Sequence, residues 1–431
     1  WIGGHWTAAP FLAADFGLKA DPNTHVYVAS AWETRKGSNI GELRLTALTK
    51  KGDREILKHQ FGEIVPPPGQ ESAHGQIGGL VVRDQFALIS MTQKNQILQI
   101  NTRTGEIMNT ISLPGPKGLA VTEDRKLLIL SENKLLKSTT RDNFQPLIDG
   151  LEDPHGITLD RNGNIYISDH GQSHQIKVFS SEGKFLRAIG NPGPPSAGPY
   201  DPLHMSHPHG ITIDSRDQLW VTENDYLPKR VSVWSLEGKF IKAFYGPAKY
   251  GGGGSLDPVD KTKFYYADEE KGSLEFKLDW ASGSWVLKNV LTRKPAMELP
   301  FRAAAPEQAI YHKGQRYFTN AFNSNPTGGH KTAFLFTERN HTIHPAAGMG
   351  QASHWELLKT AAFHSRWPKG SKPEKDSAFF IWSDSNDDAI AQPLEVTIHT
   401  AKETGGITIQ EGLTFLVTRL DGKALAFNPN S

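Results

Sequence analysis

The sequence predicts an all-β protein, a β-propeller in which four-stranded units repeat around a common axis. Three observations lead to this prediction. Short runs of β-branched and aromatic residues, such as NIYISD and QLWVTE, follow one another along most of the chain. Turn residues separate these runs, since the 431 residues include 41 glycines and 27 prolines. The runs also group in fours, with a period of about 40–50 residues that is typical of propeller blades.

The repeat is clearest in residues 155–190 and 209–246. The first copy reads HGITLD, NIYISD, QIKVFSSEGK and KFLRAIG, and the second reads HGITID, QLWVTE, RVSVWSLEGK and KFIKAFYG. Turns such as Asn162–Gly163 suit hairpins because glycine adopts a positive φ without strain. No stretch shows the 3.6-residue period of an amphipathic helix. Weaker copies of the unit lie at residues 24–62, 79–113, 118–148, 254–292 and 306–343.

The two ends of the chain predict how the ring closes. GITIQEGLTFLVTRLDGKALAFNPN, near the C-terminus, supplies three strands. We expect the beginning of the chain to supply their missing partner. This would give one propeller domain of seven or eight blades over residues 1–431. Residues 344–405 form the least regular stretch and predict an insertion.

The composition narrows the classes of function. Forty-seven basic and 46 acidic residues give a net charge of +1, so bulk charge does not indicate a nucleic-acid partner. No apolar run reaches the ~18 residues of a membrane span. Because cysteine is absent, disulfides, thiolate nucleophiles and cysteine-based zinc sites are excluded. The abrupt start WIGGHWTAAP reads like the start of a processed chain, and we expect an extracellular or periplasmic location.

PHGITLDRNGNIYISD, followed by QIKVFSSEGKFLRAIG, resembles the NHL repeat, the blade unit of a large propeller family. The match is good over residues 150–246 and fair over 77–148. Among these propellers the sequence is most similar to the streptogramin-type lyases and to the peptidyl-hydroxyglycine amidating lyase. Those enzymes carry a Pro-His pair at the head of blade strands and use axial histidines around a metal. The resemblance therefore implies a metal site at one end of the propeller channel.

Polar side chains gather at one face of the predicted propeller. Antiparallel strands place the start of strand one and the loop between strands two and three at the same rim. The long connector 191–208 lies there too, and long loops on a rigid scaffold often carry function. The residues expected at this rim are His155, Asp169, His170, His174, His204, His207, His209, Glu223, Asp225, Tyr226, Lys229 and Arg230.

Three histidines form the candidate metal site. His155 and His209 head equivalent strands, and His74 precedes another strand about three residues out of register. Lys117 stands at the histidine position of a further repeat, so the repeat itself does not require histidine there. Three imidazoles suit a divalent transition metal, with zinc as the first choice. The alternative is that each histidine caps its own strand by bonding a loop carbonyl.

Tyr226, Arg230 and His170 are the candidate catalytic residues, as a base or as charge stabilisers beside the metal. The alternative is that they are solvated loop residues. A second cation site is predicted at IWSDSNDDAIAQPLEV, which follows the spacing of an EF-hand calcium loop. Its ligands would be Asp384, Asn386, Asp388, Ile390, Gln392 and Glu395. Ala389 replaces the usual glycine of such loops, and a plain acidic turn is the alternative.

Two classes of function remain. The first is a metal-assisted lyase or hydrolase that acts on a carbohydrate or a small oxygenated metabolite at the channel mouth. The second is a non-catalytic binding module for a glycan, peptide or protein. No Gly-x-Ser-x-Gly elbow supports a serine hydrolase, and GGGG at residues 251–254 lacks the strand and helix of a phosphate-binding loop. The sequence gives no indication of oligomeric state.

Overall fold

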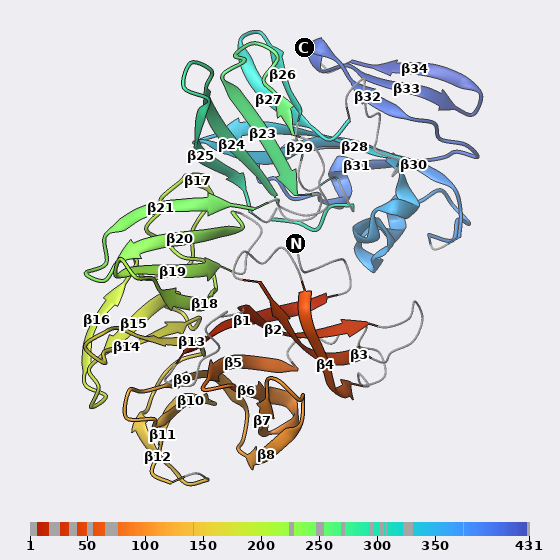
Figure 1. Ribbon diagram of the computed structural model, residues 1–431. Helices are drawn as coiled ribbons and strands as arrows, with labels where there is room; N and C mark the ends of the chain where they lie inside the picture. Colours follow the sequence, from red (N-terminus) through yellow and green to blue (C-terminus); the bar gives the residue numbers. More distant parts are fainter. Residues whose placement is uncertain are drawn as a thin grey trace. The chain divides into compact units, whose positions relative to one another are not determined.

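The structure, a computed structural model, is all-β in its described part (Figure 1). The described residues are 7–16, 26–33, 41–49, 55–64, 76–140, 142–223, 228–246, 254–268, 272–293, 296–300, 303, 306, 308–321, 331–373 and 375–428. Within these residues every helix is a short 3₁₀ helix. None of them is long and apolar enough to cross a bilayer. The chain divides into two compact units.

Unit 1 comprises Trp1–Pro194, Pro202–Asn224 and Arg230–Phe244. Its first sheet has eight strands, in the order β4-β3-β2-β1-β5-β6-β7-β8. Two antiparallel groups of four make up this sheet, and a short parallel pairing of β1 with β5 joins them. The strands are β1 (Thr7–Phe16), β2 (Val26–Glu33), β3 (Gly41–Leu48), β4 (Glu55–Ile64), β5 (Ile77–Arg83), β6 (Phe86–Met91), β7 (Gln96–Asn101) and β8 (Ile107–Ser112), with the 3₁₀ helix η1 (Thr92–Lys94) between β6 and β7.

Three four-stranded antiparallel sheets complete unit 1, each with its strands in chain order. The first consists of β9 (Pro116–Val121), β10 (Leu127–Ser131), β11 (Lys134–Ser138) and β12 (Phe144–Ile148). The second consists of β13 (Pro154–Leu159), β14 (Ile165–Asp169), β15 (Gln175–Phe179) and β16 (Phe185–Ile189). The third consists of β18 (Pro208–Ile213), β19 (Gln218–Glu223), β20 (Arg230–Ser235) and β21 (Phe240–Tyr245).

Unit 2 comprises Pro195–Asp201, Asp225–Lys229 and Tyr245–Ser431. Its sheets have five, six and three strands. The five-stranded sheet consists of β17 (Gly198–Pro199), β25 (Ser284–Thr292), β24 (Gly272–Asp279), β23 (Lys263–Asp268) and β22 (Ser255–Leu256). The six-stranded sheet consists of β26 (Gln308–His312), β27 (Gln315–Thr319), β28 (Thr332–Arg339), β29 (Thr342–Gln351), β30 (Ala378–Ser383) and β31 (Val396–Thr400). The last consists of β32 (Ile407–Ile409), β33 (Phe415–Leu420) and β34 (Lys423–Phe427).

Alternation along the strands explains how neighbouring sheets pack. In β19 the residues Leu219, Val221 and Glu223 are buried, and they share one face because side chains alternate along a strand. Leu219 and Val221 join Trp234 and residues of β14–β16 in one apolar cluster. Each sheet of this kind therefore buries one face against the preceding sheet. Glu223 lies on the same buried face, where its carboxylate accepts a hydrogen bond from the Ser206 N–H.

The predicted four-stranded units are confirmed as sheets at residues 118–148, 155–190 and 209–246. At residues 79–113 and 254–292 the four predicted strands form part of the eight-stranded and the five-stranded sheet. Residues 306–343 belong instead to a larger sheet, because β30 and β31 extend it. The region 344–405 supplies most of β29, all of β30 and β31, and four 3₁₀ helices: η3 (Ala352–His354), η4 (Glu356–Lys359), η5 (Ala361–Arg366) and η6 (Pro393–Glu395). A further 3₁₀ helix, η7 (Glu411–Leu413), precedes β33.

The expected closure by the N-terminal segment differs from the pairing of the described strands. The first of them, β1, pairs with β2 and β5. The C-terminal strands β32–β34 form a sheet of their own, without β1. The N-terminal segment thus completes the first group of four instead of the last. The number of blades, the closure of a ring and a single domain over residues 1–431 stay predictions.

Candidate functional site

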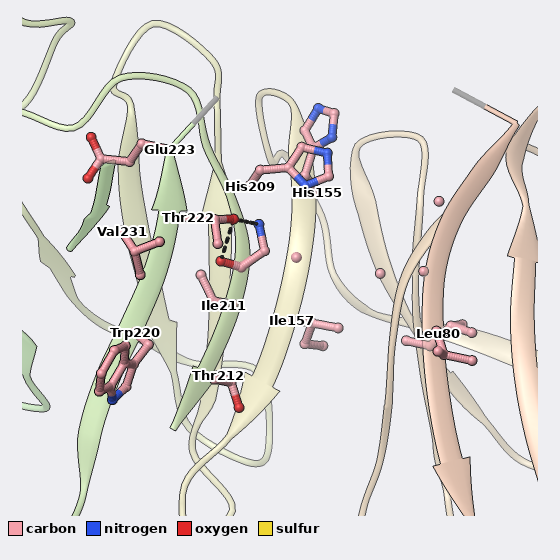
Figure 2. A pocket seen from close by; sticks show the side chains of 16 residues that line it. Leu80, His155, Ile157, His209, Ile211, Thr212, Trp220, Thr222, Glu223 and Val231 are labelled. Carbon is pink, nitrogen blue, oxygen red and sulfur yellow. Dashed lines mark hydrogen bonds between the residues drawn. The ribbon is translucent and has the colours of Figure 1, made fainter. Parts of the chain in front are cut away.

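The heads of the inner strands of unit 1 position the site. β9, β13 and β18 each begin with Pro-x-Gly, where x is Lys117, His155 or His209. The glycine allows two backbones to meet. A Cβ on Gly156 would lie 2.2 Å from the His209 carbonyl oxygen, and one on Gly118 would lie 2.5 Å from that of His155. Because the strands approach so closely, the three side chains stand in a row (Figure 2 shows His155 beside His209).

Ser168, in β14, ties two of these strands together. Its hydroxyl donates to the His209 carbonyl oxygen at 2.6 Å and accepts from the Gly156 N–H at 2.7 Å. The side chain of Ser168 is fully buried, so both bonds are shielded from water. The spacing between the His155 and His209 backbones is therefore fixed by one hydroxyl. Ser90 makes the equivalent bond to the Lys117 carbonyl oxygen at 2.6 Å.

Two buried carboxylates hold the loops that lead into β13 and β18. Asp169 accepts from the N–H groups of Asp153 and Glu152 at 2.6 and 3.1 Å. Glu223, at the equivalent position of β19, accepts from the Ser206 N–H at 2.9 Å. Figure 2 shows Glu223 directed away from His155 and His209. The two carboxylates fix the backbone that carries His155 and His209.

Five imidazoles lie in contiguous contact at this end of unit 1. The rings of His155 and His170 stack with centroids 3.8 Å apart, and the ring of His209 lies 4.9 Å from that of His155. His207 stands 5.6 Å from His170, edge to face, and 4.6 Å from His174. The backbone N–H of His207 donates a hydrogen bond to Nδ1 of His174 at 3.0 Å. The connector 191–208 thus contributes directly to the histidine cluster.

Asp153 joins this cluster to Lys117. Its Oδ2 lies 3.2 Å from Nε2 of His155 and 3.6 Å from Nδ1 of His170. Its Oδ1 accepts from Nζ of Lys117 at 2.7 Å. One ligand atom each of Asp153, His155 and His170 lie within 4.8 Å of one another. Two imidazole nitrogens and a carboxylate oxygen therefore converge closely enough to hold one metal ion.

Protonation states favour metal binding. Burial, and then the neighbouring His155 and His209, lower the pKa of His170 to about 3. Burial and His155 lower the pKa of His209 to about 4, while burial and Lys117 lower that of His155. Burial acts to raise the pKa of Asp153, but hydrogen bonds and charges from Lys117 and His155 outweigh it and bring this pKa to about 2. At pH 7 the imidazoles of His155, His170 and His209 are neutral and Asp153 is ionised, the forms that ligate metals.

One buried nitrogen supports the fit to a metal. Nε2 of His170 is inaccessible to solvent and has no hydrogen-bond partner among the described residues. A buried polar atom without a partner costs free energy, and a bound ion is one of its ordinary explanations. Imidazole and carboxylate ligands suit zinc and its neighbours in the first transition row. The residues present therefore fit a divalent transition metal.

A pocket of about 540 Å³ lies beside the cluster (Figure 2). His155 and His209 line it at one end. The remaining wall comes from the inner strands and is mostly glycine and aliphatic: Gly78, Gly79, Leu80, Gly118, Leu119, Gly156, Ile157, Gly210 and Ile211, with Thr212, Trp220, Thr222, Glu223 and Val231 from β18–β20. Its volume falls in the range of about 300–1,000 Å³ that small-molecule sites occupy.

The predicted site residues have different outcomes. The structure brings His155, His170 and His209 together. His170 was expected to be a catalytic residue, but it stands among the possible metal ligands. His74 and Tyr226 lie outside the described residues. Asp153 is a further candidate ligand that the sequence patterns did not single out.

Arg230 is buried against Glu223 and the connector 191–208. Its guanidinium donates to Oε1 of Glu223 at 2.7 Å and to the His204 carbonyl oxygen at 2.8 Å. The side chain is 1% exposed, as is that of Glu223. Arg230 therefore holds the connector 191–208 in place, and its expected catalytic role stays a prediction.

The acidic loop 384–395 is closed by its own hydrogen bonds. Asp384 accepts from the N–H groups of Asp388 and Ala389, and Asp388 accepts from the Ile390 N–H and the Gln392 amide. Glu395 accepts from Ser385, Gln392 and Trp382. In the described part of the chain these carboxylates do not converge as metal ligands do. This is the geometry of a self-capped turn, and calcium binding stays a prediction.

Residues 151–179, which span β13 to β15, match the family model of the NHL repeat. The chain carries an NHL repeat. Asp153, His155 and His170 all lie within it. This confirms the resemblance seen in the motifs.

Known proteins are similar to parts of this chain at low identity. Over 196 residues the chain is 23% identical to peptidyl-glycine alpha-amidating monooxygenase B of Xenopus laevis, covering 44% of this chain and 21% of that protein. It is 24% identical to protein brain tumor of Drosophila melanogaster over 139 residues, covering 30% and 12%. The alignments thus span about a fifth or less of these relatives. Virginiamycin B lyase from Staphylococcus aureus is 17% identical, covering 75% of this chain and 94% of that chain, with a TM-score of 0.32.

Proposed function

We propose that unit 1 binds a divalent transition metal, with zinc as the first choice, and that the protein is a metal-assisted lyase or hydrolase. The observation that carries this proposal is the convergence of Asp153, His155 and His170 next to a pocket, with a buried and unpartnered nitrogen on His170. His209 stands beside them as a fourth candidate ligand. Sequence similarity to an amidating enzyme supports the same reading.

The chain's own residues would act in distinct ways. Asp153, His155 and His170 would hold the ion, which when bound would polarise a substrate oxygen as a Lewis acid. His209 lines the pocket in the neutral form, in which one ring nitrogen carries a lone pair that can accept a proton from bound substrate. Ser168 and Asp169 would keep these groups in register through the backbone. A lyase needs this combination, a proton acceptor beside a polarised oxygen.

The pocket favours a small oxygenated metabolite over a carbohydrate as substrate. A sugar presents many hydroxyls and needs several free polar side chains. Here Thr222 exchanges hydrogen bonds with Gly210, the Trp220 indole N–H donates to Asp214, and Glu223 is paired with Arg230. The histidine end is the polar part of a wall that is otherwise glycine and aliphatic. A substrate with an oxygenated end and an apolar body matches this distribution.

The alternative is a non-catalytic module that binds a glycan, peptide or protein in the same pocket. Similarity to protein brain tumor, whose name states no enzymatic activity, keeps this alternative open. It predicts that the histidines change affinity for a partner but hold no transition metal.

Metal analysis decides between the two. Chelator-stripped protein is incubated with Zn²⁺, desalted and measured by mass spectrometry of the metal. We expect stoichiometric zinc in the wild type, and its loss in His155→Ala/His209→Ala and in His170→Ala. His399→Ala, at an exposed histidine of β31 in unit 2, is the matched control and should retain zinc. Wild-type protein that takes up no zinc, or a double variant that keeps it with intact circular dichroism, would refute the proposal.

A further inference from the structure

Lys117 occupies the third place in the row of strand heads. It stands in β9 where His155 stands in β13 and His209 in β18, each between a proline and a glycine. Its ammonium lies 2.7 Å from Oδ1 of Asp153, and its side chain is 22% exposed. The neighbouring Gly118 and His155 both line the pocket. Lys117 is not itself among the lining residues, but its ammonium stands next to the candidate metal ligands.

The other carboxylates near the strand heads are directed at other partners. Asp169 accepts from the backbone of Glu152 and Asp153. Glu152 in turn accepts from the N–H groups of residues 172 and 173, and Glu223 is paired with Arg230. Asp153 is thus the carboxylate that faces both Lys117 and the histidines.

Charge at this point is unbalanced once an ion is bound. A divalent ion and Lys117 carry three positive charges against one negative charge on Asp153. Such an excess in a cleft attracts anions and raises their local concentration. Lys117 also has donors to spare, because an ammonium offers three N–H groups and Asp153 takes one of them.

We propose that Lys117 binds a carboxylate of the substrate, which assigns to the site a carboxylate-bearing small molecule. This inference rests on the proposed metal site. The ammonium keeps its bond to Asp153 and donates a second one to the substrate carboxylate. That contact orients the oxygenated end of the substrate next to the ion, while the apolar body lies along the glycine-lined strands. Arg230, the expected charge stabiliser, is buried away from this position, and Lys117 is the cation that the strand register brings to it.

The test uses the full chain loaded with Co²⁺, whose visible absorption reports on the metal's surroundings, and acetate as the probe. We expect acetate to change the spectrum saturably and Lys117→Met to weaken its binding about tenfold, the loss of one charge-assisted hydrogen bond. Lys117→Arg should bind acetate within a few-fold of the wild type. Lys134→Met removes the same charge from β11, where Lys134 pairs with Asp149 at 3.4 Å, and should leave acetate binding unchanged. Acetamide is the neutral control ligand.

The outcomes separate the two proposals. If wild-type protein gives no Co²⁺ spectrum, the metal site fails and this inference falls with it. If Co²⁺ binds but Lys117→Met keeps full acetate affinity, or Lys134→Met loses as much, only the role of Lys117 is refuted. If Lys117→Met loses Co²⁺ itself, Lys117 positions Asp153 and does not bind substrate, which also refutes the inference.

Discussion

At the residue scale, the glycines at the strand heads determine whether the site can form. A Cβ on Gly156 would lie 2.2 Å from the His209 carbonyl oxygen, a backbone atom that cannot yield without moving β18. A Cβ on Gly210 would meet Thr222 Oγ1 at 3.1 Å, which is a milder contact with a side chain. We expect Gly156→Ala to lower the free energy of unfolding by roughly 1–3 kcal/mol or more, and Gly210→Ala by less. Urea unfolding followed by tryptophan fluorescence measures both. Equal losses of unfolding free energy in the two variants would contradict the close approach of Gly156 to the His209 carbonyl oxygen.

Ser168 offers a second residue-scale prediction. Ser168→Ala leaves the His209 carbonyl and the Gly156 N–H without their buried partner, so we expect a loss of about 1–3 kcal/mol in stability. The variant should also bind zinc more weakly, because the spacing of His155 and His209 is no longer fixed. Ser90→Ala is the matched control. This variant removes the hydrogen bond to the Lys117 carbonyl oxygen instead. We expect it to lower the stability of the protein and to leave the zinc affinity, measured in a competition assay, unchanged.

Part of this site can be predicted from the sequence, and the rest depends on residues that are distant along the chain. His155 and His209 could be singled out because Lys117 fills the same repeat position, so the fold does not require histidine there. Asp153 could not be ranked above other acidic residues, since its value comes from partners on β9 and in the loop after β14. From the sequence, Arg230 reads as a loop residue at the rim. Its ion pair with Glu223 follows from the burial of one face of β19, which the sequence of the loop does not show.

At the element scale, local patterns predicted the strands well and their long-range pairing poorly. A strand's alternation and its glycine turns are properties of a few neighbouring residues, and the sheets from β5 to β25 follow them. The pairing of β1 with β5 joins segments that are more than 60 residues apart, and a pattern of a few neighbouring residues does not encode such a pairing. The same limit applies to residues 344–405, where β30 and β31 extend an existing sheet. That this stretch is an insertion stays a prediction.

The loop 384–395 gives an element-scale prediction with a pH dependence. Burial acts to raise the pKa of Glu395, but hydrogen bonds from Ser385, Gln392 and Trp382 lower it below the usual 4.5. A carboxyl group with a lowered folded pKa contributes its stabilisation above pH 4.5, and loses it as the pH falls through that folded pKa. We expect Glu395→Gln to destabilise the protein at pH 7 and to differ little from the wild type near pH 3. Unfolding curves at the two pH values test this.

The same loop separates self-capping from calcium binding. Because its acceptors already have protein donors, we expect a calcium chelator to leave the melting temperature unchanged at pH 7. A chelator-induced fall, restored by added Ca²⁺ and absent in Asp384→Asn, would instead establish the calcium loop that the ligand spacing suggested.

At the scale of the whole molecule, the structure gives two compact units with separate apolar clusters, and one ring over residues 1–431 stays a prediction. The repeat period does not reveal such a division, because it describes each sheet and not which sheets share a core. The site's described residues all belong to unit 1. Binding there should therefore act on the stability of unit 1 first.

Hydrogen exchange tests this whole-molecule consequence. An ion that binds only the folded state stabilises it by about 2.7 kcal/mol at a free concentration 100 times its dissociation constant. We expect Zn²⁺ to slow exchange in peptides from β13, β14 and β18, whose ends carry the histidines, and to leave β30 and β31 of unit 2 unchanged. The His155→Ala/His209→Ala protein should show no protection. Equal protection of both units would mean that they open together, and protection of unit 2 alone would place the ion elsewhere.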